Sequence, residues 1–333
     1  MSHKSKLWQL AGRFQSLFVL ILMIVAMSLL SDRFLPLANG WNIMRQISVN
    51  VCLSIGMTMV ILSGGIDLSV GSVLAFAGAI TAGLIKSPLP LPWLGVEVQC
   101  TTLGAIFAGL LVGSFLGWFN GLMITRVRIP PFVATLGMLS IARGMTMLWT
   151  KGFPITGLGE QFAVIGTGSV VLIAAPVRIA IPAPVLIAGT LVGVFVLITR
   201  KTRLGRYIYA VGGNEQTAKL SGLNVNRIKL IVYTLAGALS AAAGLIVTSR
   251  LDSAQPNAGM GYELDSIAAV VIGGTSLSGG RGTVLGTVVG CMIIGVLNSG
   301  LVLLNVSPFW QQVVKGGVIL VAVAIDRLRE KND

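Results

Sequence analysis

Residues 200–229 read RKTRLGRYIYAVGGNEQTAKLSGLNVNRIK and form the one long polar interruption in a strongly apolar chain. Across the 333 residues, 54% are apolar, 11% are charged, and the mean hydropathy is +0.88. Soluble domains carry roughly 25% charged residues. The composition therefore predicts a membrane protein in which this basic stretch connects two membrane spans.

Apolar runs near the ~20 residues needed to cross the hydrocarbon core lie on both sides of this stretch. They occupy residues 14–30, 43–62, 70–85, 101–124, 132–149 and 184–199 before it, and 230–248, 264–273, 283–304 and 309–325 after it. The run at 264–273 is too short to span alone, so it is either a half-helix or part of a longer, glycine-broken segment. We expect one all-α domain over residues 1–333, a polytopic transmembrane bundle of about ten helices with glycine-interrupted helices and a possible internal repeat.

The distribution of Lys and Arg predicts the orientation, because these residues are retained on the cytoplasmic side during insertion. With the N-terminus inside, most of them fall in the tail 1–13, the loop 200–229 and the tail 326–333. We therefore expect a multi-pass membrane protein with both termini in the cytoplasm. The net charge of +13 reflects this topology and contact with membrane lipid, so we expect no nucleic-acid partner.

Glycines recur every four residues in two of the apolar runs, which places each set on one helix face. The two ladders are Gly109, Gly113, Gly117 and Gly121, and Gly282, Gly286 and Gly290. Such faces let helix backbones approach closely. The ladders could form seams within the chain or an interface between two copies, and the sequence leaves both open.

A second glycine pattern consists of residues 64–71 (GGIDLSVG) and 273–280 (GGTSLSGG), which share five of eight positions at an offset of 209. Irregular backbone at membrane depth persists where it is buried in protein or lines a wet cavity, and interrupted helices often flank transport pathways. The candidate interruption and gating residues are Gly64, Gly65, Asp67, Ser69, Gly71, Gly273, Gly274, Gly279 and Gly280. Asp67 has two interpretations: a functional carboxylate, or, as we favour, a cap of the following helix.

Within the polar stretch, capping residues predict a short helix of about two turns. Asn214 is a suitable N-cap, Glu215 places a negative charge in the first turn, and Gly222 can end the helix in a left-handed conformation. So short a helix is marginal in water and needs packing against something else.

Several chemistries lack the residues they require. His3 is the only histidine, and the three cysteines have no paired spacing, so we expect no metal site and no cofactor bound by this chain. Residues 277–281 (LSGGR) superficially resemble an ATPase signature, but no GxxxxGK[ST] phosphate loop occurs. We therefore expect a non-catalytic chain that does not itself hydrolyse ATP.

Three stretches together are similar to the membrane permease subunit of bacterial ribose-type ABC importers, which carry monosaccharides or autoinducer-2. The resemblance covers nearly the whole chain, and its motifs occur in the family's order. The stretches are residues 50–79 (NVCLSIGMTMVILSGGIDLSVGSVLAFAGA), 203–229 (RLGRYIYAVGGNEQTAKLSGLNVNRIK) and 253–282 (SAQPNAGMGYELDSIAAVVIGGTSLSGGRG).

The resemblance implies an ATP-driven importer built from several parts. These are a second permease copy, as a homodimer or paralogous heterodimer, a cytoplasmic ABC ATPase that holds ATP and Mg, and a periplasmic sugar-binding protein. The binding protein would dock on the external segments 88–99 and 150–184. By match to the family's motif, the helix that couples to the ATPase would include Gly213, Asn214, Glu215, Ala218, Ser221 and Gly222.

A path for a neutral polyol should present hydroxyl and amide groups with few fixed charges. The candidate pathway residues are Asn50, Thr58, Asn120, Asn298, Trp310 and Gln311. The alternative function is an ion-coupled secondary transporter of a small polar solute, for which Asp67, Glu263 and Asp265 are the plausible relay acids. The sequence does not identify the sugar.

Overall fold

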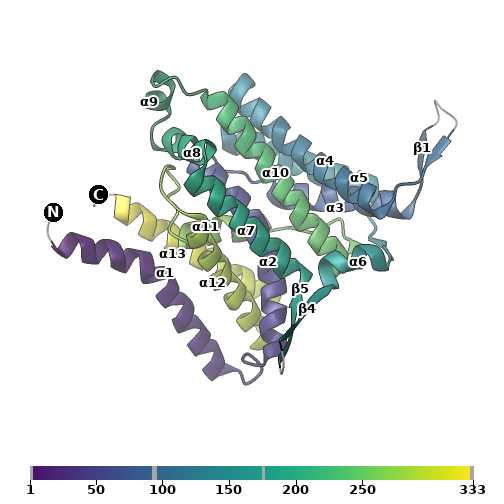
Figure 1. The fold of residues 1–333 in the computed structure, drawn as a ribbon, viewed down its shortest axis with the longest axis horizontal. Coiled ribbons are helices and arrows are strands. Elements are labelled where there is room, and N and C mark those ends of the chain that lie inside the picture. The colour runs from purple at the N-terminus through teal and green to yellow at the C-terminus, as the bar shows by residue number, and fades with distance from the viewer. Residues whose placement is uncertain (1–2, 92–95, 175–176, 331–333) are drawn as a thin grey trace.

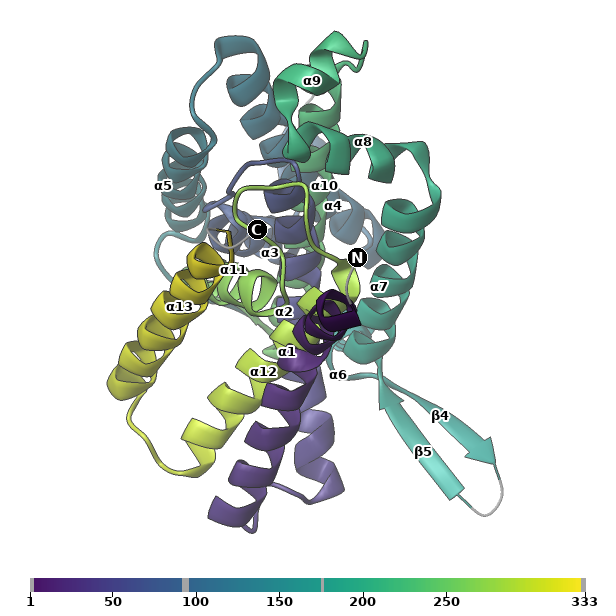
Figure 2. The same ribbon diagram turned by 90° about the vertical axis from the view of Figure 1, so that its left-hand side faces the viewer.

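The computed structural model describes residues 3–91, 96–174 and 177–330, and it forms a bundle of helices (Figures 1 and 2). The long helices are α1 (His3–Leu30), α2 (Leu37–Leu62), α3 (Val70–Lys86), α4 (Thr102–Leu122), α5 (Pro131–Thr150), α7 (Ala183–Lys201), α10 (Val225–Arg250), α12 (Val284–Leu303) and α13 (Pro308–Glu330). The short helices are α6 (Glu160–Thr167), α8 (Arg203–Gly213), α9 (Glu215–Leu220) and α11 (Tyr262–Ile272), and a π-helical turn η1 (Met123–Val127) extends α4.

Strands form only small antiparallel pairs in the described part of the chain. These pairs are β1 (Leu89–Leu91) with β2 (Val96–Val98), β3 (Ile155–Thr156) with β6 (Ser253–Ala254), and β4 (Ser169–Ala174) with β5 (Val177–Pro182). The all-α architecture predicted from the apolar runs is therefore confirmed.

Each predicted apolar run coincides with a helix to within a few residues at its boundaries, α1 and α13 excepted, which continue into the predicted tails. Within the described residues, six helices are long and apolar enough to cross a membrane, namely α2, α4 with η1, α5, α7, α10 and α12. The count of about ten spans stays a prediction. Residues 3–13 of the N-terminal tail and 326–330 of the C-terminal tail belong to α1 and α13, and residues 1–2 and 331–333 lie outside the described residues.

The short apolar run near residue 264 is a half-length helix. α11 has 11 residues, which corresponds to ~16 Å at 1.5 Å per residue, about half the thickness of a hydrocarbon core. It is preceded by residues 251–261, which contain only the two-residue strand β6, and it ends at Gly273. Of the two alternatives for this run, the half-helix is correct.

α2 is the central helix of the bundle, and every residue from Ile47 to Leu62 in it is buried. It contacts α7, α10, α11 and α12, which surround it in both views (Figures 1 and 2). Helices at the periphery instead expose apolar side chains, as Phe107, Leu111 and Phe115 do along one face of α4. A helix with a lipid-facing side requires this distribution.

The ladder on α4 and the pair Gly286 and Gly290 on α12 form seams within the chain, whereas Gly282 precedes the N-cap of α12 and does not lie on a helix face as predicted. Along α4, Gly113 faces Ala241 and Gly237, and Gly117 faces Gly237 and Tyr233, all of them on α10. Along α12, Gly286 lies against Gly273 and Gly290 lies against Ala269 of α11. Because glycine has no side chain, the helix backbones touch at these positions. The glycines therefore pack helices together within one protomer.

The polar stretch 200–229 is a series of capped helices and not one loop with a single short helix. α7 continues to Lys201, α8 follows, α9 comes next, and α10 begins at Val225. Thr202, Asn214 and Asn224 each cap a helix by accepting a backbone N–H bond three residues later. Our expectation overlooked α8, whose buried residues Gly205, Ile208 and Val211 follow helical spacing.

Candidate functional site

The candidate site lies at the end of the bundle where α8 and α9 project (Figure 2). α9 is capped at both ends as predicted. The Asn214 Oδ1 accepts a bond of 2.8 Å from the Thr217 N–H, and Gly222 takes a φ of +82°. The N–H groups of Gly222 and Leu223 bond to the carbonyls of Lys219 and Ala218, which is the Schellman pattern.

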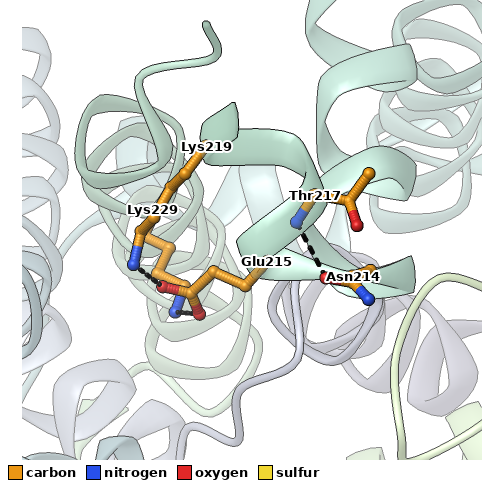
Figure 3. A network of polar contacts seen from close by, with 5 residues as sticks. All are labelled: Asn214, Glu215, Thr217, Lys219 and Lys229. Atoms are coloured by element: carbon orange, nitrogen blue, oxygen red, sulfur yellow. Dashed lines mark hydrogen bonds and ion pairs between the residues drawn. The ribbon is translucent and has the colours of Figure 1, made fainter. Parts of the chain in front are cut away.

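Glu215 ties α9 to the start of α10. Its two carboxylate oxygens bind separate ammonium groups, Lys219 within α9 and Lys229 on α10, each at 2.7 Å (Figure 3). The pKa of the Glu215 carboxyl is lowered, first by the hydrogen bond from Lys219 and then by that from Lys229. We call these three residues the Glu215 clamp. The sequence placed Glu215 in the first turn, but its bond to Lys229, 14 residues away, depends on the tertiary structure.

The Glu215 clamp predicts a local dependence of α9 on pH. A depressed carboxyl pKa contributes stability that is present above the ordinary Glu pKa and is lost as the pH falls through the folded value. We expect amide hydrogen exchange in residues 215–223, corrected for the intrinsic rate, to accelerate as the pH falls below about 4.3. Glu215→Gln should exchange faster at neutral pH and show no such acceleration. Equal pH dependence in both proteins would contradict the clamp.

One face of α9 packs and the other is free. Ala218 is 4% exposed, whereas the apolar side chain of Leu220 is 90% exposed. Gln216 and Thr217 are also exposed, and Ser221 follows them on the surface. α9 thus holds Leu220 and the polar side chains beside it in a fixed position on the surface.

The two glycine-rich stretches form loops, residues 63–69 between α2 and α3 and residues 273–283 between α11 and α12. These two glycine loops begin with the same helix-ending geometry. α2 ends with bonds from Gly64 N to Ile61 O and from Gly65 N to Val60 O, and α11 ends with bonds from Gly274 N and Thr275 N to Val271 O and Val270 O. Gly64 and Gly274 are the left-handed residues, with φ of +81° and +87°.

This geometry repeats at an offset of 210 residues and not at the 209 of the sequence match. In each loop the left-handed residue that follows the helix is a glycine, Gly64 or Gly274. The sequence match instead paired Gly64 with Gly273 and Gly65 with Gly274. The second loop is also longer, since the N-cap of α3 is Ser69 and that of α12 is Thr283. The repeat is therefore limited to the helix ends.

The two loops meet each other and α8. The Gly280 N–H donates to the Leu62 carbonyl at 3.1 Å, and the Tyr209 hydroxyl of α8 donates to the Gly282 carbonyl at 2.8 Å. Gly212, near the end of α8, lies against both Leu62 and Gly280. Gly64, Gly212, Gly279 and Gly280 thus converge from three segments, and we call them the glycine junction.

Asp67 lies inside the protein and is 2% exposed. Its Oδ1 accepts bonds from the Ser69 N–H at 2.8 Å and the Ser69 hydroxyl at 2.6 Å. The favoured interpretation of Asp67 holds in part: its carboxylate accepts a backbone N–H bond at the start of α3, but the N-cap position itself is Ser69, whose side chain makes no capping bond. Asn120 of α4 donates to the Ser69 hydroxyl at 3.0 Å, so this polar group links the loop to α4.

The candidate pathway residues occupy varied positions. Thr58 shares a hydroxyl hydrogen bond of 2.7 Å with Thr287, and Asn50 is 9% exposed. The Asn298 Oδ1 is buried without a hydrogen-bond partner among the described residues. Gln311 donates to the Val306 carbonyl, and Trp310 is 64% exposed on α13. Their roles in transport stay predictions.

Charged residues within apolar helices have partners that the sequence did not identify. Lys315 of α13 pairs with Asp265 of α11 at 2.9 Å. Arg143 of α5 donates to the carbonyls of Pro256 and Ala258 at 2.7 and 2.8 Å. Among the residues that the structure describes, no group of three or more His, Cys, Asp or Glu could hold a metal ion.

Comparison with known proteins relates the sequence of this chain to a group of transport proteins. A family profile described as the permease component of the branched-chain amino acid transport system matches residues 40–323. The chain is 45% identical to the ribose import permease of Escherichia coli (strain K12), over 98% of this chain and 96% of that protein. It is 48% identical to the ribose import permease of Bacillus subtilis (strain 168), over 98% and 95%. It is 38% identical to the D-allose transport system permease of Escherichia coli (strain K12), over 97% and 93%. No solved structure matches at a significant level.

Proposed function

This chain belongs to the permease family of bacterial sugar ABC importers, and we propose that it forms the translocation path of an ATP-driven importer for a monosaccharide or similar small polyol. As a permease it is a transport subunit of a multi-pass inner-membrane assembly and not an enzyme. A separate cytoplasmic ABC ATPase, with its ATP and Mg, would supply the energy.

The observation that carries the proposal is α9. It is the projecting element whose ends are capped, whose Glu215 is clamped to α10, and whose Leu220 is 90% exposed. A helix of six residues has little stability alone, so its fixed geometry makes it a contact for a partner and not a passive connection. We assign the ATPase contact to this helix, so α8 and α9 would lie in the cytoplasm, and the distribution of Lys and Arg predicts the same side for both termini.

The other partners follow from this orientation. α7 begins directly after β5 and ends directly before α8, so the β4–β5 hairpin lies at the opposite end of that helix (Figure 1). A periplasmic sugar-binding protein would dock at this hairpin end, and a second copy of the permease, identical or paralogous, would complete the path. ATP-driven closure of the ATPase would draw the two α9 helices together and open the external gate.

Ribose is the first substrate to test. The two ribose permeases are 45% and 48% identical to this chain, and the D-allose permease is 38% identical. The branched-chain amino acid wording of the family profile does not favour an amino acid, because these relatives are named as sugar permeases.

The decisive experiment compares the energy sources for uptake. We expect uptake of radiolabelled D-ribose by proteoliposomes holding this chain, its ATPase and its binding protein to require internal ATP and to persist when a protonophore collapses the proton gradient. D-Allose and D-galactose are tested in parallel. Uptake that survives without ATP but stops with the protonophore would overturn the proposal in favour of the ion-coupled secondary transporter.

A backbone change in α9 should have the same outcome as ATP removal. Gly213→Pro and Asn214→Pro are expected to abolish uptake while the chain stays in the membrane, because proline disrupts the end of α8 or the start of α9. Asn214→Ser, which keeps a capping side chain, is the matched control. Normal uptake by both proline variants would contradict the assignment of α9.

A further inference from the structure

α8 touches both glycine loops through contacts that involve backbone. The Tyr209 hydroxyl bonds the Gly282 carbonyl at 2.8 Å, and the Gly280 N–H bonds the Leu62 carbonyl at 3.1 Å beside Gly212. A Cβ atom placed on Gly212 would lie 2.6 Å from the Gly280 nitrogen and would overlap the Leu62 carbonyl oxygen. The contact therefore leaves no room for a side chain.

α8 is also fixed to the helix before it and to α9 after it. Gly205 packs against the last turn of α7, and Ile208 and Val211 are buried. Asn214 ends α8 and caps α9, so this one residue joins the two helices. A displacement of α9 therefore acts within two residues of Gly212.

The two loops lead to different helices of the bundle. The first joins α2 to α3, and the second joins α11 to α12. Because backbone groups meet at the glycine junction, no side-chain rotation can accommodate a displacement of α8 against the loops. Packed contacts of this kind change between discrete arrangements.

Resting on the function proposed above, we propose that Gly212 and Tyr209 are positioning residues of a joint that transmits movement of α9 to both glycine loops at once. Gly212 holds the end of α8 against the Leu62 carbonyl and Gly280, and Tyr209 holds the second loop at Gly282. The family's motif directed attention to Gly213, where an added Cβ would meet nothing within 4 Å. The residue that excludes a side chain is its neighbour Gly212, although the backbone of Gly213 also lies close to Gly280.

The first test measures coupling in the assembled transporter. For Gly212→Ala and Tyr209→Phe, we expect the ATPase to co-purify and to hydrolyse ATP, while D-ribose taken up per ATP hydrolysed falls by roughly tenfold. The matched control is Gly137→Ala in α5, where a Cβ, unlike one on Gly212, would meet nothing within 4 Å. This control should keep the wild-type ratio of D-ribose taken up to ATP hydrolysed. Tyr209→Phe removes only a hydroxyl, so it tests the joint even if Gly212→Ala fails to fold.

The second test compares hydrogen exchange in the wild-type complex and in the Tyr209→Phe complex. Hydrogen exchange in residues 62–71 and 273–283 should change together when a non-hydrolysable ATP analogue binds the ATPase, and the Tyr209→Phe complex should lose the response at 273–283. A wild-type ratio in Tyr209→Phe, loss of ATPase binding by that variant, or a response of one loop alone in the wild type would each overturn the joint. Absence of ATP-dependent uptake by the wild type would instead overturn the proposed function.

Discussion

Asp265→Leu is expected to destabilise the protein by about 3–5 kcal/mol, because it leaves the Lys315 ammonium within an apolar bundle without its partner. The carboxylate is 6% exposed on its side chain, the lysine is 27% exposed, and their bond of 2.9 Å joins α11 to α13. An ion that loses its partner in a low-dielectric interior keeps the full cost of desolvation. Lys315→Met should be similarly harmful, since it leaves the carboxylate unpaired.

The double variant Asp265→Leu/Lys315→Met distinguishes a packing role from a transport role. Replacing a buried ion pair by apolar side chains of similar volume is often neutral, so most of the stability should return. Thermal unfolding of the detergent-purified protein measures all four members of this cycle. Two harmless single variants would contradict the assigned pairing. A stable double variant that retains D-ribose uptake would also exclude Asp265 as a relay acid.

Gly117→Leu is expected to prevent the packing of α4 on α10, with a loss of at least about 3 kcal/mol. A Cβ at this position would overlap the Tyr233 carbonyl oxygen and lie 3.0 Å from the backbone N and Cα of Gly237. Because these neighbours are backbone atoms, the two helices must separate to admit any side chain.

The matched control for this variant is Gly189→Leu, at an exposed position of α7 where a Cβ would meet nothing within 4 Å. The control adds the same side chain to a helix without a seam and should leave the unfolding temperature close to that of the wild type. The reciprocal variant Gly237→Leu should reproduce the loss, because its Cβ would overlap the Gly113 carbonyl from the other side. An unfolding temperature of Gly117→Leu equal to that of Gly189→Leu would show that the seam is not tightly packed.

Parts of the candidate site could be read from local sequence. Asn214 and Gly222 mark the ends of α9 because capping depends on residues three or four positions apart. The glycine loops were found as two similar stretches of sequence, and the structure shows that one glycine in each is the left-handed residue that ends a helix. The match of residues 64–71 with 273–280 was shifted by one residue, because a count of identical residues treats every glycine as equivalent. In the structure, of the two glycines that begin each stretch, only Gly64 and Gly274 are left-handed.

The partners of these residues could not be predicted. Gly212 and Gly213 are indistinguishable in sequence, yet a Cβ on Gly212 would meet the backbones of Leu62 and Gly280, whereas a Cβ on Gly213 would meet nothing within 4 Å. The Glu215–Lys229 and Asp265–Lys315 bonds join residues 14 and 50 positions apart on different helices. The ladder of Gly109 to Gly121 carried no information on whether it faces α10 or a second copy.

By itself, the sequence determined the membrane class, most of the long helices and the caps of α9, because lipid requires each span to satisfy its own backbone hydrogen bonds and capping is local. The tertiary structure alone decided which glycine faces joined α4 to α10 and α11 to α12, which buried charges paired, and that α8 meets both glycine loops at Gly212. Close backbone contact arises when the fold brings together segments that are far apart in the sequence. A glycine permits such a contact but does not determine where it forms.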